Sequence, residues 1–159
     1  MASDVVKRVF LGHNLNVKPF QEQAIVSLVS GKDVFVSVPT GHGKTFAYCF
    51  LPEIFSILQS KPFSIVIVIS PLISLMIDQV SRMETLGIKA AFVGEGQTSS
   101  TVITDVKNGL YNIVFISPEA ILESSWRYML NTEVYQNCLS TLVIDECHCI
   151  EEWYDLSTF

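Results

Sequence analysis

The chain has 159 residues, a length that fits one domain with a hydrophobic core. Hydrophobic residues make up 49% of it, but they come in short blocks, and none reaches the roughly 20 consecutive apolar residues that a membrane-spanning helix needs. The net charge of −6 argues against a freestanding cationic nucleic-acid binder, although it is compatible with a local basic groove.

The first part of the chain predicts two helical stretches with a strand between them. Residues 18–29 have apolar side chains at helical spacing, and Gly31 ends this helix. Residues 34–38 (VFVSV) predict a short strand, which leads through a glycine-bearing turn into a helical stretch over residues 44–59.

The rest of the chain alternates strands and helices. Short β-branched and apolar runs predict strands at residues 64–69, 90–93, 112–116 and 141–144. Helices are predicted over residues 71–85 and 98–108 and, mixed with loops, over residues 118–139. This alternation indicates βαβ units and therefore an α/β fold with a mainly parallel sheet.

The segment at residues 38–45 (VPTGHGKT) follows a predicted strand and opens a predicted helix, which is the setting of a phosphate-binding loop. Glycines let backbone N–H groups turn toward phosphates, Lys44 can reach the β- and γ-phosphates, and the Thr45 hydroxyl can bind Mg²⁺. Val38 stands where the strict pattern has glycine. The other predicted loop residues are Thr40, Gly41, His42 and Gly43, with no chemistry of its own assigned to His42.

Two carboxylates, Asp145 and Glu146, follow the last predicted strand directly. Ligands in open α/β sheets bind at the carboxyl ends of the strands. There Asp145 can hold Mg²⁺, usually through water, and Glu146 can orient or deprotonate an attacking water. Each carboxylate alone is more often a solvated strand end, but the upstream phosphate loop favours the catalytic interpretation.

Several segments together resemble RecQ-type helicases of superfamily 2. Residues 145–148 (DECH) resemble the DEAH-type motif II, with cysteine at the variable third place. Residues 68–80 resemble motif Ia, and residues 115–119 (FISPE) resemble motif Ib. Lys18 to Gln21 resembles the Q-motif region, and residues 147–153 resemble the start of the RecQ aromatic-rich loop. The similarity extends from about residue 11 to residue 153.

This resemblance implies that residues 1–159 form part of the first RecA-like lobe of an ATP-dependent 3′-to-5′ DNA helicase. ATP and Mg²⁺ would be its cofactors, with Gln21 contacting adenine and His148 linking ATP to the DNA-sensing motifs. Single-stranded or forked DNA and a second motor lobe would be its partners, and a nuclear location would follow. The implied nucleic-acid contacts are Ser70, Pro71, Ser117 and Trp153.

The chain also departs from the family pattern. Glu151 and Glu152 stand where the aromatic-rich loop usually has small or polar residues, and two negative charges should weaken contact with DNA. Trp153 is compatible with a base-stacking platform or with a partly buried anchor. Motif III, whose strand lies in the family between the phosphate-loop and motif II strands, is not found, so the lobe is expected to be incomplete at its carboxyl end.

Three functions of different classes therefore stay open. The first is a RecQ-type helicase of which the chain holds one motor lobe. The second is a catalytically inactive remnant that binds nucleotide or DNA, which the absent second lobe and the Glu151–Glu152 pair favour. The third is another P-loop NTPase, such as a small-molecule kinase, against which the motif Ia and Ib segments argue.

Overall fold

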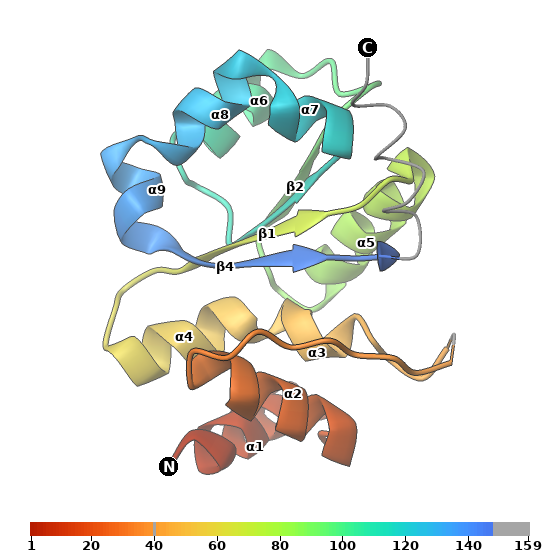
Figure 1. The fold of residues 1–159 in the computed structure, drawn as a ribbon, viewed down its shortest axis with the longest axis vertical. Helices are drawn as coiled ribbons and strands as arrows, with labels where there is room; N and C mark the ends of the chain where they lie inside the picture. The colour runs from red at the N-terminus through yellow and green to blue at the C-terminus, as the bar shows by residue number, and fades with distance from the viewer. Residues whose placement is uncertain (40, 148–159) are drawn as a thin grey trace. The chain divides into compact units, whose positions relative to one another are not determined.

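The computed structural model describes residues 1–39 and 41–147 of the chain. The chain divides into two compact units, residues 1–64 and residues 65–159, and each is described by itself. The first is helical and contains the predicted phosphate loop, and the second contains the sheet (Figure 1).

Four helices make up the regular structure described in the first unit. They are α1 (Ala2–Gly12), α2 (Pro19–Val29), α3 (Phe46–Cys49) and α4 (Leu51–Gln59). Apolar side chains of α1 and α4 are buried, and the Phe10 ring lies edge-on to the Phe50 ring with 4.9 Å between centroids. Pro19 starts α2, a position where its missing N–H group costs no helical hydrogen bond.

The helix predicted over residues 44–59 is two helices with a break at Phe50, whose ψ angle is 1°. Pro52 lies in the first turn of α4 and has no N–H group to continue the hydrogen bonding of α3, so the helix restarts there. Pro52 was the sequence signal for this break.

The strand predicted at residues 34–38 is wrong. The segment is extended, but it is not part of the sheet and pairs with no strand in the described chain. A strand needs a hydrogen-bonded neighbour, and apolar composition alone does not supply one. Val34, Phe35 and Ser37 are consequently exposed to solvent, and Phe35 is 79% exposed.

The four strands of the sheet confirm the other strand predictions. They are β1 (Ile65–Ile69), β2 (Ala90–Val93), β3 (Ile113–Ile116) and β4 (Leu139–Ile144). Their order is β2-β3-β1-β4, and every pair is parallel, as the alternating pattern predicted. The α/β class is therefore confirmed.

Helices connect these strands and cover the sheet. They are α5 (Ile73–Thr85), α6 (Ser100–Lys107), α7 (Pro118–Leu122), α8 (Ser124–Leu130) and α9 (Glu133–Cys138). Figure 1 shows α6, α7 and α8 on one face of the sheet and α5 on the other, the arrangement that right-handed crossovers produce when the chain reverses direction across the sheet. No described helix has the length and apolar character needed to cross a membrane.

Burial differs between the inner and outer strands. Ile65 to Val68 of β1 and all of β3 are buried, whereas β4 forms one side of the described sheet. On β4, Leu142 and Ile144 are about half exposed. The core of the second unit therefore lies around β1 and β3, and the strand that leads to the acidic pair is its more open side.

Candidate nucleotide and nucleic-acid site

The predicted phosphate loop is a turn built on two glycines in the left-handed backbone region. The φ angles of Gly41 and Gly43 are +81° and +89°, which side chains with a Cβ adopt only at a cost. The His42 N–H donates to the Pro39 carbonyl at 3.3 Å, and helical hydrogen bonding begins with the Phe46 N–H on the Gly43 carbonyl at 3.1 Å. The loop thus runs directly into a helix, as the motif predicts.

Two side chains from the start of α2 hold this turn. The Gln21 Nε2 group donates to the Gly43 carbonyl at 2.9 Å, and the Lys18 Nζ group donates to the His42 carbonyl at 2.9 Å. Gln21 is itself fixed, because its Oε1 atom accepts the Lys18 backbone N–H at 2.8 Å. The side chain of Gln21 is only 2% exposed. The segment that resembles the Q-motif therefore contacts the phosphate loop directly.

The space at Gly43 is also tight. A Cβ at this position would lie 3.2 Å from Gln21 Nε2, so the glutamine amide would have to shift. A Cβ on Gly41 would meet no atom within 4 Å. The two glycines therefore share a backbone requirement, but only Gly43 makes room for Gln21.

Lys44 and Thr45 stand at the junction of the turn and α3, and both are partly buried. In the described part of the chain the Lys44 ammonium makes no hydrogen bond or ion pair with another side chain or carbonyl. An ammonium with no counter-ion among the described residues, in a glycine-bearing loop, is suited to an anionic ligand.

The predicted acidic pair lies directly after β4. The Asp145 N–H donates to the Ile69 carbonyl at 2.9 Å, which continues the pairing of β4 with β1 by one residue. The Glu146 N–H donates to Asp145 Oδ1 at 3.0 Å, and Glu146 has a φ angle of +53°. A left-handed glutamate is uncommon and is held at a cost that is typical of functional sites.

The strand register places several predicted residues at one edge of the sheet. Ile69 of β1 is opposite both Ile116 of β3 and Ile144 of β4. The next residue on each strand is Ser70, Ser117 and Asp145, respectively. Neighbouring strands are about 4.8 Å apart. The strands β1, β3 and β4, which lead into the motif Ia, motif Ib and motif II segments, therefore end side by side, with Ser70 between Ser117 and Asp145.

The two serines are more buried than a direct nucleic-acid contact suggests. Ser70 is 1% exposed, and its Oγ has no hydrogen-bond partner among the described residues. Ser117 is 4% exposed and begins α7, where its Oγ accepts the Ala120 N–H at 3.2 Å. Pro71 is partly exposed. Contact of Ser70, Pro71 and Ser117 with DNA stays a prediction.

Several predicted residues lie outside the described part of the chain: Thr40 of the phosphate loop, His148, the Glu151–Glu152 pair and Trp153. Within the described residues, Gly41, His42, Gly43, Lys44, Thr45 and Gln21 belong to the first unit, and Asp145 and Glu146 belong to the second. The sequence did not predict the contacts of Lys18 and Gln21 with the loop, which join residues more than 20 positions apart.

Comparison with known proteins finds a helicase family model and helicases that are similar to this chain. A family model described as DEAD/DEAH box helicase matches residues 18–158. The chain is 35% identical to ATP-dependent DNA helicase Q5 of Rattus norvegicus, covering 93% of this chain and 15% of that protein. It is 33% identical to ATP-dependent DNA helicase RecQ of Pasteurella multocida, covering 96% of this chain and 22% of that protein.

The fold has a counterpart among solved structures. A hypothetical ATP-dependent RNA helicase from Sulfolobus tokodaii superposes with a TM-score of 0.65 at 22% sequence identity, covering 97% of this chain and 44% of that one. This likeness establishes the helicase-type fold alone. The chain spans only 15% and 22% of the two sequence relatives named above.

Proposed function

Because the chain belongs to the DEAD/DEAH box helicase family and RecQ-type helicases are among its relatives, we propose that it forms the ATP-binding motor lobe of an ATP-dependent 3′-to-5′ DNA helicase. The observation that carries this proposal is the shared edge of the sheet. Asp145 of motif II lies one strand from Ser70 of motif Ia and two strands from Ser117 of motif Ib. A motor needs its nucleotide chemistry next to its nucleic-acid contacts.

Phosphate binding is assigned to the glycine turn and Lys44. Left-handed glycines allow backbone N–H groups to turn toward phosphates, and the Lys44 ammonium adds the cation that phosphate oxygens require. The Thr45 hydroxyl and the Asp145 carboxylate are hard oxygen ligands of the kind Mg²⁺ prefers. ATP with Mg²⁺ would supply the γ-phosphoryl group that reacts with water.

Glu146 is assigned to the attacking water, which it would orient or deprotonate. The Glu146 backbone is left-handed, and its N–H donates to Asp145 Oδ1, which orients the Asp145 carboxylate next to this residue. His148 would link this site to the DNA-sensing segments. Motors of this family also use an arginine from the second lobe, which raises the rate of ATP hydrolysis by a factor of about 10³ to 10⁵.

Adenine recognition is assigned to Gln21. A glutamine amide has two N–H groups and two acceptor lone pairs, and the bonds to Gly43 and Lys18 use one of each. The remaining N–H and lone pair match the N7 acceptor and N6 donor of adenine. Since Gln21 is 2% exposed, adenine would reach it only after a neighbouring side chain moves.

The DNA partner is assigned to the segments beginning at Ser70, Pro71 and Ser117, with Trp153 as a stacking residue. Single-stranded or forked DNA is the proposed substrate, and a nuclear location is proposed from the eukaryotic relatives. The relatives named above include a bacterial protein, RecQ of Pasteurella multocida, as well as the rat protein.

The test measures binding and hydrolysis separately. Lys44→Ala should abolish ATP·Mg²⁺ binding to the 159-residue chain in calorimetry, because the phosphates lose their cation. In a protein that also has a second lobe, Glu146→Gln should bind ATP normally and hydrolyse it roughly 10² times more slowly, because the amide keeps the shape and loses the base. Equal ATP affinity in Lys44→Ala would refute the loop assignment.

The same experiment separates the helicase from an inactive binding remnant. A remnant would bind ATP through Lys44, but the two-lobed protein would show no DNA-stimulated hydrolysis. DNA-stimulated hydrolysis that Glu146→Gln abolishes would establish the motor. Transfer of the γ-phosphoryl group from ATP to a small molecule, without stimulation by DNA, would instead indicate a kinase.

A further inference from the structure

The hydroxyl of Ser70, directly after β1, is a buried polar group that no described residue satisfies. Ser70 is 1% exposed, and its Oγ atom has no hydrogen-bond partner among the described residues. A buried hydroxyl without a partner costs stability, so each one in a native protein needs an explanation. The neighbouring Ser117 differs, because its Oγ accepts the Ala120 N–H and thereby caps α7. Helix capping therefore explains the hydroxyl of Ser117 but not that of Ser70.

The backbone fixes the direction of the Ser70 side chain. The Ser70 N–H donates to the Ile116 carbonyl of β3 at 3.0 Å, and the Ile69 carbonyl before it accepts the Asp145 N–H at 2.9 Å. Pro71 follows, and a proline disfavours helical backbone at the residue before it. Ser70 is thus held in the extended backbone of β1, and the alternation of side chains between the two faces of the sheet continues to it.

The strand register places Asp145 beside Ser70. Ile69 is opposite Ile144, so Ser70 and Asp145 form the next pair, and paired residues of parallel strands share a face of the sheet. The strands are about 4.8 Å apart, a span that a hydroxyl and a carboxylate can bridge once their side chains rotate toward each other. Asp145 Oδ1 accepts the Glu146 N–H at 3.0 Å. A carboxylate can accept about four hydrogen bonds, so this bond does not preclude a second donor.

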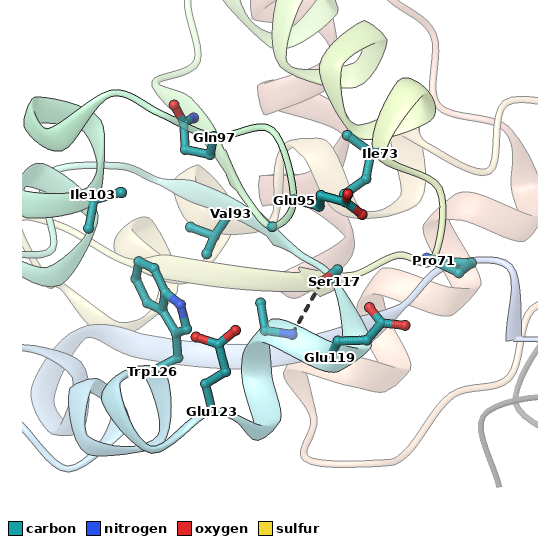
Figure 2. Close-up of a pocket in the computed structure, with 12 residues that line it drawn as sticks. Pro71, Ile73, Val93, Glu95, Gln97, Ile103, Ser117, Glu119, Glu123 and Trp126 are labelled. Carbon is teal, nitrogen blue, oxygen red and sulfur yellow. Dashed lines mark hydrogen bonds between the residues drawn. The ribbon is translucent and has the colours of Figure 1, made fainter. Parts of the chain in front are cut away.

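Direct contact with a nucleic acid does not explain the Ser70 hydroxyl. A pocket opens at the carboxyl ends of the strands, and Figure 2 shows Pro71 and Ser117 in its wall. Ser70 is not among the described residues that line this pocket. A DNA strand at this opening would therefore meet Pro71 and Ser117, the neighbours of Ser70, and the Ser70 hydroxyl would stay covered.

We propose that Ser70 is a positioning residue for Asp145, whose carboxylate accepts the Ser70 hydroxyl when ATP and Mg²⁺ bind. Carboxylates that hold a metal ion are usually hydrogen-bonded themselves, and these bonds fix their orientation. The bond would satisfy the Ser70 hydroxyl and hold the Asp145 carboxylate toward Mg²⁺. Because Pro71 follows Ser70 and lines the pocket, the bond would also join the nucleotide site to the segment assigned to DNA. This inference rests on the proposed role of Asp145 in holding Mg²⁺.

The experiment measures ATP binding to the 159-residue chain by calorimetry, once with Mg²⁺ and once with EDTA. Ser70→Ala should weaken binding of ATP with Mg²⁺ roughly tenfold, the lower end of the range for residues that support a metal ligand. The affinity for ATP in EDTA should not change, whereas general damage to the fold would lower both affinities. The control is Ser64→Ala, which removes a fully buried hydroxyl just before β1, at its other end, and should change neither affinity.

Two further measurements test whether the effect passes through Asp145. In a double-mutant cycle, Ser70→Ala should weaken the binding of ATP with Mg²⁺ no further when Asp145→Asn is already present, because the carboxylate that it positions is gone. In urea unfolding without nucleotide, Ser70→Ala should leave the midpoint unchanged or raise it, because it removes a buried hydroxyl that has no partner to lose. A lower midpoint would show that the hydroxyl is already bonded without nucleotide.

The outcomes separate this inference from the proposed function. If Asp145→Asn weakens the binding of ATP with Mg²⁺ and Ser70→Ala does not, the positioning role is wrong and the role of Asp145 stands. If neither substitution has an effect, both roles are wrong. Independent losses in the double-mutant cycle, or a lower urea midpoint for Ser70→Ala, would also overturn the positioning role. If Ser70→Ala weakens binding of a thymidine oligonucleotide and leaves the affinity for ATP with Mg²⁺ unchanged, the hydroxyl belongs to the DNA contact instead.

Discussion

Residues 34–38 (VFVSV) and residues 65–69 (IVIVI) are almost interchangeable as sequences, yet only the second is a strand. β1 is paired on both sides, by β3 and by β4, and Ile67 is fully buried. Residues 34–38 pair with no described strand, and Phe35 is 79% exposed. β-propensity thus describes how well a segment fits into a sheet. Whether the segment forms a strand also depends on a neighbouring strand that can pair with it.

The largest expected difference between the two segments is in stability. Ile67→Ala should lower the free energy of unfolding by about 2–5 kcal/mol, because it leaves a cavity in the core of the sheet. Phe35→Ala should change the free energy of unfolding by less than about 0.5 kcal/mol, because the ring is mostly in solvent. Urea unfolding followed by circular dichroism measures both, and similar losses would show that residues 34–38 are packed after all.

A smaller effect tests the glycine turn that follows residues 34–38. Gly43→Ala and Gly41→Ala should each cost roughly 1–2 kcal/mol of backbone strain, because both positions have positive φ. Only Gly43→Ala should also weaken ATP binding through Gln21, whose Nε2 would lie 3.2 Å from the new Cβ. Calorimetry with ATP on both variants tests this, and equal ATP affinities would contradict a role of Gln21 in ATP binding.

The smallest effect concerns the contact between α9 and α6. Tyr135 of α9 is fully buried and donates its hydroxyl to the Val106 carbonyl at 2.6 Å. Tyr135→Phe should cost about 1 kcal/mol of stability at neutral pH. Tyr128→Phe is the matched control, because that ring is 74% exposed and should show no change.

The same tyrosine predicts a pH dependence. Burial raises the pKa of Tyr135, so the folded chain keeps the hydroxyl protonated more strongly than the unfolded chain does. This contribution to stability is fully present below the unfolded pKa of about 10 and is lost as pH rises above that value. Tyr135→Phe should therefore flatten the loss of stability between about pH 10 and pH 11, and an unchanged slope would contradict the assignment.

Much of the second unit could be predicted from sequence because its signals are local. Each predicted strand there is a short apolar run, and turn residues such as Gly109 separate it from a helix. Residues 34–38 carry the same local signal but do not form a strand. Strand formation also needs a neighbouring strand, and the fold decides whether one is there. The break in the helix at Phe50 was not predicted, although Pro52 was a sequence signal for it.

The candidate site divides in the same way. The glycine turn and the Asp145–Glu146 pair follow from short motifs in their strand and helix setting. The contact of Gln21 with Gly43 joins residues distant in sequence, and no spacing rule reports such a pair.

The common edge formed by Ser70, Ser117 and Asp145 has a mechanical consequence. Adjacent parallel strands are joined by backbone hydrogen bonds that stretch little, so β4, β1 and β3 behave as a stiff plate about 10 Å across between Asp145 and Ser117. A stiff plate of this kind moves as a unit. A displacement of Asp145 would therefore also displace Ser117, which lies across the single intervening strand β1.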